Sequence, residues 1–325
     1  MEVSSKRNNS SLLFLLLAIF GCGMLFVFWS EFKTALEASC DFVAGAKVCE
    51  SDSLRTLART FIWGSLALPL ALLLERIIPA KPNQPLLSLG LRQDIAWWVV
   101  ALLIKLTVIA GFSYLLYQVF ESYLSFLRID FISSLPATAQ TVTVILLADF
   151  LAWFHHWVRH KVPFFWEFHK IHHSQREMNY FCDMRIHPMD SINARIIGFI
   201  PFYSLDLNTA IPTFLAWEIL QSWYTNFSHS NLKTNYGLLR YVLVTPQSHR
   251  IHHSIEKRHQ DKNFAVVFSI WDFIFRTQHL DFVEYPDTGV DDPSFPNEHD
   301  ARPLELLKNT IRQIIYPFKF LAGYR

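Results

Sequence analysis

The stretch ILLADFLAWFHHWVRH (residues 145–160) decides the fold, because in it an apolar run passes directly into the pair His156 and His160. Residues four positions apart share one face of an α-helix, so the two imidazoles point the same way. His155 points about 100° away on such a helix, and we do not expect it among metal ligands. We expect a rigid helix that leaves an apolar environment and holds two imidazoles at its end.

Two further histidine clusters share the pattern H-[KR]-I-H-H-S. They stand in WEFHKIHHS (166–174) and PQSHRIHHS (246–254). Their spacing again places imidazoles on a common helix face, and neutral imidazole is the commonest metal ligand in proteins. Together the three clusters contain His156, His160, His169, His172, His173, His249, His252 and His253.

Eight convergent imidazoles are more than one ion takes, because a zinc site closes at about four ligands. The clusters therefore predict two metals in one site. The sequence has no H-E-x-x-H zinc-peptidase motif and no C-x-x-C pair. A shell made almost purely of histidine suits iron that reacts with dioxygen. His279 and His299 stand apart from the clusters, and we interpret them as ordinary core or surface residues.

Long apolar runs before the clusters indicate an integral membrane protein. Of the 325 residues 51% are hydrophobic, and four runs lie at 11–29, 61–79, 95–119 and 137–154. Each run alone also fits a buried core helix, but four in one chain favour membrane spans of about 20 residues. The first run is long for a signal peptide and lacks a small-x-small cleavage site, so we interpret it as a retained anchor.

The charges that flank the first run set the expected topology. Lys6 and Arg7 precede it and place the N-terminus in the cytoplasm, and four crossings bring the chain back there near residue 155. We therefore expect an all-α fold with about four transmembrane helices in residues 1–154 and a cytoplasmic helical cap in residues 155–325. A bacterial inner membrane is favoured, with the endoplasmic reticulum as the alternative.

One segment of the cap, residues 195–227, is again apolar and breaks at Asp206, Asn208 and Pro212. Each half is short for a full span, which predicts a re-entrant helical hairpin at membrane depth. Glu218 in its second half is then expected to face a cavity or a partner. The alternative is a hairpin at the interface, where Glu218 meets water.

Two cysteines lie in the loop between the first two runs. Cys40 and Cys49 fall outside the cytoplasm in this topology, where a disulfide can form. A disulfide and two free thiols are equally compatible with the sequence.

The histidine clusters and their surroundings resemble the fatty acid hydroxylase/sterol desaturase superfamily of integral membrane di-iron enzymes. The resemblance covers roughly residues 145–280. The first family motif, D-F-x-x-Y-W-x-H-R-x-x-H, is matched at Asp149, Phe150, His156 and His160, with Trp153, Phe154 and Trp157 as departures. The second, W-x-F-H-x-x-H-H-S, is matched at 166–174, and the third histidine box at 249–254.

Three shorter family motifs are also matched. R-x-H-P-x-[ED] is matched at Arg185, His187, Pro188 and Asp190, and F-x-H-S-N at Phe227, His229, Ser230 and Asn231. The trailing D-x-N-[FY]-G…W-D-x-[LI]-F-G-T is matched at Asp261, Asn263, Phe264, Trp271, Asp272, Phe275 and Thr277, with Ala265 and Arg276 in place of its glycines.

The resemblance implies roles for individual residues. The eight clustered histidines become iron ligands, and His229 becomes a ninth. Asp149 and Asp190 become acceptors for the N–H groups of ligand histidines. Arg185 is implied near the ligands or the substrate, and His187 either orients a ligand, contacts substrate or ligates iron itself.

The activity that the resemblance implies is that of an O₂-dependent hydroxylase, a monooxygenase that acts on a lipid or another hydrophobic substrate. It implies two Fe ions and O₂ as co-substrate. No haem-binding H-P-G-G or flavin-type G-x-G-x-x-G segment is present, so electrons are expected from an external donor, either a cytochrome b5-like protein or a ferredoxin. No nucleic-acid partner is expected.

Basic residues around the clusters offer a docking face for that donor, namely Arg159, Lys161, Lys170, Arg250, Lys257 and Arg258. The alternative is the ordinary cytoplasmic excess of positive charge.

Other functions stay open at the level of sequence. A desaturase, a sterol methyl oxidase and an ether-lipid-cleaving monooxygenase share the same superfamily. Outside it, a non-catalytic metal-binding membrane protein such as a transporter or sensor remains, although its ligands would be expected inside the spans.

Overall fold

The computed structural model describes residues 67–104, 115–116, 118–204 and 207–323, and helices dominate it. The α-helices are α3 (Ala67–Ile77), α4 (Leu89–Ile104), α6 (Asp130–Ser133), α7 (Ala137–Lys161), α8 (Pro163–His173), α9 (Pro188–Phe199), α10 (Leu207–His229), α11 (Pro246–His252), α12 (Ile270–Ile274) and α13 (Pro303–Leu321). Shorter helical turns are η2 (Phe120–Leu124), η3 (Ser125–Leu127), η4 (Cys182–Met184), η5 (Ile200–Ser204), η6 (Gly237–Tyr241) and η7 (Lys257–His259).

β-structure in these residues is limited to isolated bridges, for example between Leu243 and Phe268. The expectation of a helical fold is confirmed for the described part of the chain.

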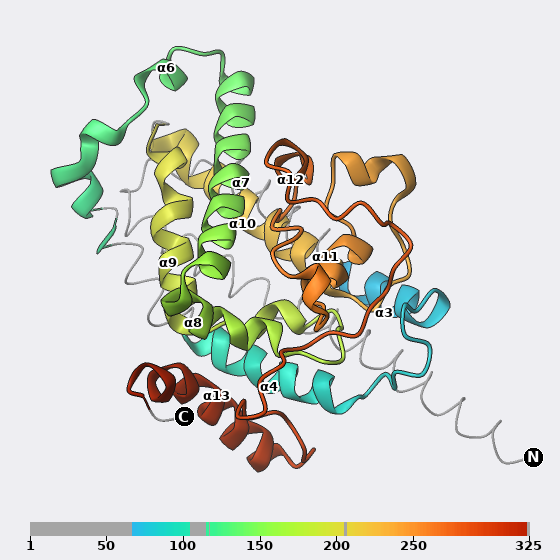
Figure 1. Cartoon of the computed structure of the whole chain (residues 1–325). Helices are drawn as coiled ribbons and strands as arrows, with labels where there is room; N and C mark the ends of the chain where they lie inside the picture. The colour runs from blue at the N-terminus through green and yellow to red at the C-terminus, as the bar shows by residue number, and fades with distance from the viewer. Residues whose placement is uncertain (1–66, 105–114, 117, 205–206, 324–325) are drawn as a thin grey trace, which may run out of the picture.

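The helices pack around the C-terminal end of α7, which carries His156 and His160. Figure 1 shows α7 standing upright with α9 beside it, while α10 runs obliquely behind it in this view and α8 crosses its lower end. On the other side of α8, α13 packs along α4. Polar side chains join this pair, since Gln93 Nε2 donates to Thr310 Oγ1 at 2.8 Å and Trp97 Nε1 donates to Gln313 Oε1 at 2.6 Å.

Helix α7 carries the apolar stretch that precedes the first histidine pair. It is the one helix among the described residues that is long and apolar enough to cross a membrane. Its 25 residues extend over about 37 Å, more than a bilayer core of about 30 Å. Helices α3 and α4 cover parts of the second and third apolar runs. The run at 11–29 and the cysteines Cys40 and Cys49 lie outside the described residues.

Proline begins three of the helices that carry or support the histidines. Pro163, Pro188 and Pro246 each occupy the first turn of α8, α9 and α11. Proline fits there because its missing N–H would have no helical partner. Between α7 and α8 only Val162 is extended, which turns the chain sharply. The histidines at the end of α7 therefore face those of α8.

The segment of the predicted hairpin, residues 195–227, contains the end of α9, the turn η5 and most of α10. Helix α9 ends at Phe199, where the chain continues as the tighter turn η5, and Asp206 of the predicted break lies outside the described residues. Asn208 and Pro212 instead lie in the early part of α10. Glu218 on α10 meets a partner, Arg195 on α9, at 2.8 Å.

Candidate metal centre

All nine histidines that the sequence singles out come together in two adjacent groups. The first group contains His156, His160, His169, His173 and His252, and the second group contains His172, His229, His249 and His253. Within each group, one ring nitrogen from every member lies within 4.8 Å of the others. Each group therefore has enough ligands for one metal ion.

Neighbouring histidines fall into different groups. His172 and His173 are the last two residues of α8, while His252 is the last residue of α11 and His253 directly follows it. Consecutive side chains on a helix point about 100° apart, so each H-H pair contributes one imidazole to each group. His229 is the last residue of α10 and reaches the second group from the hairpin.

Burial favours the neutral form of the cluster histidines outside α7. Burial lowers the pKa of His169, His172, His173 and His249 well below the usual value, and it lowers that of His252 to about 3. A neutral imidazole keeps one unprotonated nitrogen, which is the form that binds a metal.

Backbone carbonyls fix which nitrogen is unprotonated in the first group. His156 Nδ1 donates to the Phe264 carbonyl at 2.7 Å, and His252 Nδ1 donates to the Lys262 carbonyl at 2.8 Å. A carbonyl can only accept, so both protons sit on Nδ1. The two Nε2 lone pairs then face each other at 2.9 Å.

The second group repeats this arrangement around His229. Its Nδ1 donates to the Thr225 carbonyl at 2.7 Å, and its Nε2 lies 2.8 Å from His249 Nε2 and 3.1 Å from His172 Nε2. The Nδ1 atoms of His172, His249 and His253 are buried without a hydrogen-bond partner.

These contacts fit metal ions in both groups. Two lone pairs at 2.9 Å repel each other, and a cation between them converts the repulsion into two ligand bonds. The donor set also fits, because imidazole suits iron, copper and zinc.

Asp190 occupies the supporting position that the sequence suggested for it. Its Oδ2 accepts from His169 Nδ1 at 2.8 Å and from Arg159 Nη1 at 3.0 Å. Burial raises the pKa of Asp190, and the Arg159 guanidinium opposes that rise. A carboxylate behind a metal-binding histidine fixes the ring and increases its basicity.

Asp149 was predicted to accept from a ligand histidine, and this prediction is wrong. Its carboxylate accepts from the backbone N–H groups of Val267 and Phe268 and from Trp271 Nε1, at 2.9–3.1 Å. Its side chain faces the chain around 267–271, so it fastens that segment to α7 instead.

Arg185 and His187 lie outside both groups. Arg185 is fully buried, where it pairs with Asp94 at 2.7 Å and with Glu298 at 3.1 Å. His187 Nδ1 accepts from the Met189 N–H at the start of α9, and its Nε2 donates to the Ile314 carbonyl of α13 at 3.1 Å. Both ring nitrogens of His187 are therefore occupied, and it joins two helices.

The acceptors that orient the ligands could not be read from side chains. Those of His156 and His252 are carbonyls on the segment after α11, and Asp272 holds that segment by accepting from the N–H groups of Phe264 and Ala265 at 2.9 Å. Within it Asn263 has φ +58°, which asparagine tolerates. Arg276, which stands where the family pattern has glycine, has φ +59°. The family motif around these residues was the only available signal.

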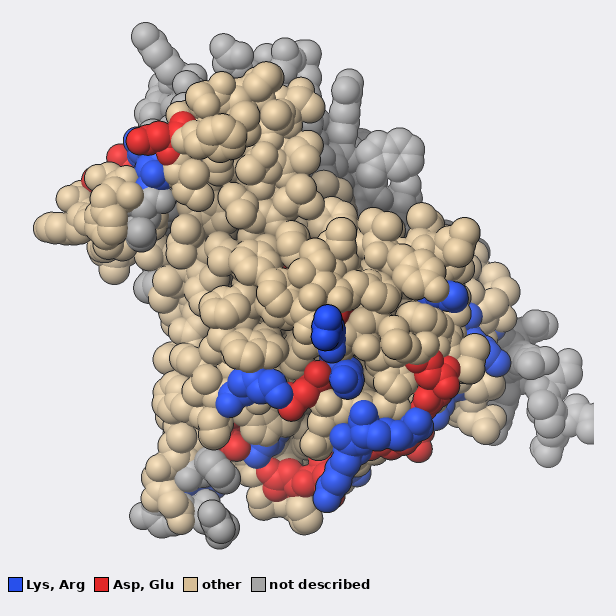
Figure 2. Space-filling model, turned by 45° about the horizontal axis from the view of Figure 1, so that its top comes forward, with Lys and Arg blue, Asp and Glu red and all other residues tan. Residues whose placement is uncertain are grey.

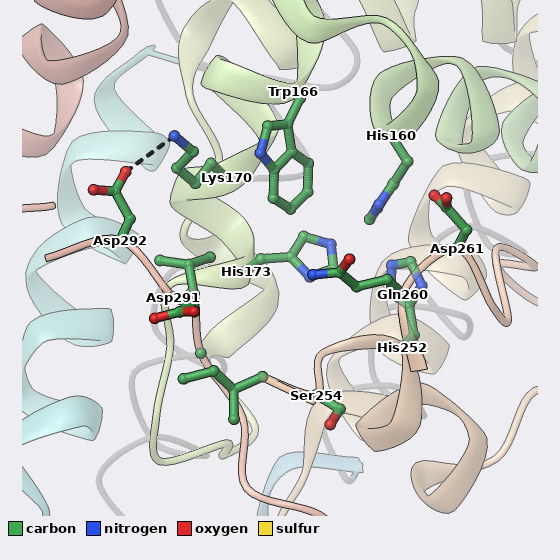
Figure 3. Close-up of a pocket in the computed structure, with 13 residues that line it drawn as sticks. His160, Trp166, Lys170, His173, His252, Ser254, Gln260, Asp261, Asp291 and Asp292 are labelled. Atoms are coloured by element: carbon green, nitrogen blue, oxygen red, sulfur yellow. Dashed lines mark hydrogen bonds and ion pairs between the residues drawn. The ribbon is translucent and has the colours of Figure 1, made fainter. Parts of the chain in front are cut away.

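A cavity of about 380 Å³ opens onto the first group. Figure 3 shows His160, His173 and His252 at its inner side, with Trp166 beside them and Lys170 paired to Asp292 at one edge. A second cavity of about 230 Å³ lies between α7, α9 and α10, and His155 lines it. None of the nine histidines lines the second cavity.

Three of the six basic residues expected to form a docking face are buried or nearly so, which corrects that expectation. Arg250 lies 1% exposed and donates to Asn231, Lys170 pairs with Glu167 and Asp292, and Arg159 pairs with Asp190. These three side chains interact with partners inside the protein and do not contribute to an exposed docking face. Lys257 and Arg258 are exposed, and Lys161 is partly exposed.

Comparison with known proteins agrees with this site. Residues 141–277 match the family model described as fatty acid hydroxylase. The ornithine lipid hydroxylase OlsE of Rhizobium tropici is 28% identical over 144 residues, which are 44% of this chain and 43% of that protein. The alkylglycerol monooxygenase of Homo sapiens is 32% identical over 125 residues, 38% of this chain and 27% of that protein.

The alkylglycerol monooxygenase of Caenorhabditis elegans is 29% identical over 133 residues, 41% of this chain and 26% of that protein. The chain thus matches less than half the length of each of these relatives. No solved structure matches it. The resemblance to the fatty acid hydroxylase/sterol desaturase superfamily is confirmed over the region that carries the histidines.

Proposed function

We propose that this chain, whose residues 141–277 belong to the fatty acid hydroxylase family, is a membrane-bound, O₂-dependent lipid hydroxylase with two irons. The observation that carries the proposal is the convergence of nine imidazole nitrogens in two adjacent groups. Iron changes oxidation state and zinc does not, so a histidine shell with two such groups suits oxygen chemistry. When bound, the irons would supply O₂ activation and the breaking of an aliphatic C–H bond.

In this reaction the protein itself orients the histidine rings and keeps bulk water away from the metal centre. The carbonyls of Lys262, Phe264 and Thr225 keep the ligand protons on Nδ1, so that Nε2 is free toward the metal. Asp190 does the same for His169. Most of these side chains are buried, which keeps bulk water from the reacting centre.

The substrate we propose is an amphipathic lipid. Two kinds of relative are named for acting on ornithine lipid and on alkylglycerol, which both combine a polar part with apolar chains. The cavity on the first group is lined by both kinds of residue. Trp166 and Val290 are apolar, and Lys170, Asp291 and Asp292 are charged. Its polar side suits the head of the lipid, and its inner side leads to the histidines.

Ether cleavage is the second reaction that these relatives suggest. Hydroxylation of the carbon next to an ether oxygen gives a hemiacetal, which splits into an aldehyde and an alcohol. The hydroxylase and the ether-cleaving enzyme therefore share one oxidation step, and the position of the substrate decides the product.

The membrane placement we propose has α7 as a span, with the histidine groups at its cytoplasmic end and with further spans in residues 1–154. Exposed apolar side chains along α7, such as Val142 and Leu146, support it. On the face shown in Figure 2, Lys, Arg, Asp and Glu gather in the lower part, while a broad band above them is almost free of charge. Such a band is what a lipid-facing surface requires.

Electrons in this proposal come from an external donor of the cytochrome b5 or ferredoxin type. Lys161, Lys257 and Arg258 are exposed and form its docking face in this proposal, although Arg258 also pairs with Glu256 and Glu284 and Lys161 pairs with Asp261.

Metal analysis and oxygen uptake of the full chain in detergent test the proposal. We expect about two irons per chain, one per histidine group, and reductant-dependent O₂ uptake with a lipid extract that yields a product heavier by one oxygen. An aldehyde product would select ether cleavage. The variant His172→Ala should lose the iron of its own group together with turnover, while His299→Ala, an exposed histidine outside the groups, should keep both irons and turnover. Zinc alone, without O₂ uptake, would overturn the proposal.

A further inference from the structure

A third set of metal-binding side chains lies outside the two histidine groups. His259 in η7 and His279 and Glu284 in the segment after α12 bring their ligand atoms within 4.8 Å of one another. His259 Nε2 lies 3.3 Å from Glu284 Oε2, and His279 Nε2 lies 3.4 Å from Glu284 Oε1. The two imidazole rings meet edge to face at 4.9 Å.

These spacings agree with a tetrahedral zinc site. Zinc–nitrogen and zinc–oxygen bonds of about 2.0–2.2 Å place neighbouring ligand atoms about 3.4 Å apart. The two nitrogen–oxygen distances of 3.3 Å and 3.4 Å are close to this length, and each involves a different oxygen of Glu284. Two histidines and one glutamate supply three ligands, and the partial exposure of His279 and Glu284 leaves a side from which water can supply a fourth.

The second observation is that the buried Nε2 of His259 has no hydrogen-bond partner. The residue is 1% exposed, and its Nδ1 lies 2.8 Å from Ser254 Oγ. Its Nε2, aimed toward Glu284, has no hydrogen-bond partner of acceptable geometry. If Nε2 carries the proton, a buried donor is left without a well-formed hydrogen bond. If it carries the lone pair, that lone pair faces a carboxylate.

A cation removes the difficulty in either case, because it displaces the proton or accepts the lone pair. The ligands are also in the right protonation state. Burial is the main reason that the pKa of His259 is lowered, and hydrogen bonds from Arg258 are the main reason that the pKa of Glu284 falls to about 2.

Arg258 competes with a metal ion for this carboxylate. It donates to both oxygens of Glu284, at 2.9 Å for Nη1 to Oε1 and through Nη2 to Oε2. A carboxylate has about four lone-pair positions, so two remain for a metal. The guanidinium charge still opposes a nearby cation, and Arg258 therefore weakens metal binding at this place.

We propose that His259, His279 and Glu284 form a third metal site, which takes Zn²⁺ and is separate from the centre of the nine histidines. The site joins η7 to the segment after α12. Residues next to η7, among them Ser254, Gln260 and Asp261, form a wall of the cavity on the first group. A bound metal would therefore stabilise the position of these lining residues at the cavity.

Metal counting on the full-length protein in detergent tests this site, after incubation with Zn²⁺ and removal of the excess. We expect one zinc per chain that His279→Ala removes while its iron content stays unchanged, and His299→Ala should keep both. Co²⁺ in the same site should give the visible absorption of tetrahedral coordination. Arg258→Gln should tighten zinc binding, because it removes an opposing charge.

Two results would overturn the site. One is equal zinc content in the wild-type protein and in His279→Ala, and the other is weaker zinc binding in Arg258→Gln. Either would make the cluster a metal-free ion pair built around Arg258. The test does not depend on the proposed function, because the count that His279→Ala changes is read separately from the iron of the nine histidines.

Discussion

The two histidine groups differ in how firmly the protein orients them. In the first group three members have an acceptor behind Nδ1: Phe264 O for His156, Lys262 O for His252 and Asp190 for His169. In the second group only His229 has one, while the Nδ1 atoms of the other three are buried without a partner. The first group also faces the cavity, and the second does not.

This difference indicates that imidazole rings in one centre can be oriented in two ways, either by the protein or by the bound ion. Rings with fixed tautomers are preorganised for metal binding, and the first group also borders the cavity in which we propose that the substrate binds. The second group depends on the ion itself to order its rings. We therefore expect the first group to be sensitive to its supporting residues, and the second group to be sensitive chiefly to its ligands.

Removal of one ligand from each group gives the largest expected effect. His252→Ala and His249→Ala change two residues of α11 that serve different groups. Each should abolish lipid oxidation and lower the metal content from about two ions to about one per chain. Metal analysis and product detection check this. If each variant lost both ions, the groups would behave as a single unit and the comparison would fail.

Removal of a supporting carboxylate should have a smaller effect that differs between the groups. Asp190→Asn weakens the hydrogen bond behind His169, and loss of such a partner lowers metal affinity about 10–100-fold. Asp183→Asn is the matched control, because Asp183 lies 3.8 Å from His229 Nδ1, which already donates to a carbonyl. Metal competition with a chelator measures both. Equal losses would show that orientation of His169 is not decisive.

The segment that carries the orienting carbonyls can be loosened without touching a ligand. Asp272→Asn replaces a carboxylate that accepts from Phe264 N, Ala265 N and Trp153 Nε1. We expect a loss of about 1–3 kcal/mol in the free energy of unfolding, because buried donors lose their partner. The first group should lose metal before the second. Thermal unfolding with parallel metal analysis checks this, and Asp300→Asn on the surface serves as control.

Loss of a charge pair at the edge of the cavity should have the smallest effect on stability and metal content. Lys161 pairs with Asp261, and both side chains are more than a third exposed. Pairs of this kind contribute about 0–1 kcal/mol. Lys161→Gln should therefore leave the unfolding temperature and metal content unchanged within error. A large loss of metal would mean that the rim orients the first group as strongly as Asp190 does.

Much of the centre could be predicted from the chain alone. The spacing of the histidine clusters showed which imidazoles share a helix face, and helix α7 runs from its apolar residues to His160 as that spacing required. His229 needed the family motif, because a single histidine at the end of an apolar segment has no periodic signal. Asp149 was misassigned for a related reason. A carboxylate near a ligand in sequence can point away from it, and Asp149 accepts from the 267–271 segment instead.

The sequence by itself determined the ligand type, the number of metals expected and the helical frame, because these follow from residue identity and from the 3.6-residue period of the helix. Only the tertiary structure decided how the ligands are shared out. His172 and His173 are adjacent in the chain, yet they serve different groups because the helices packed against α8 offer them different partners. The carbonyls that set the tautomers likewise exist in every residue, and only folding brings those of Lys262, Phe264 and Thr225 behind a ligand.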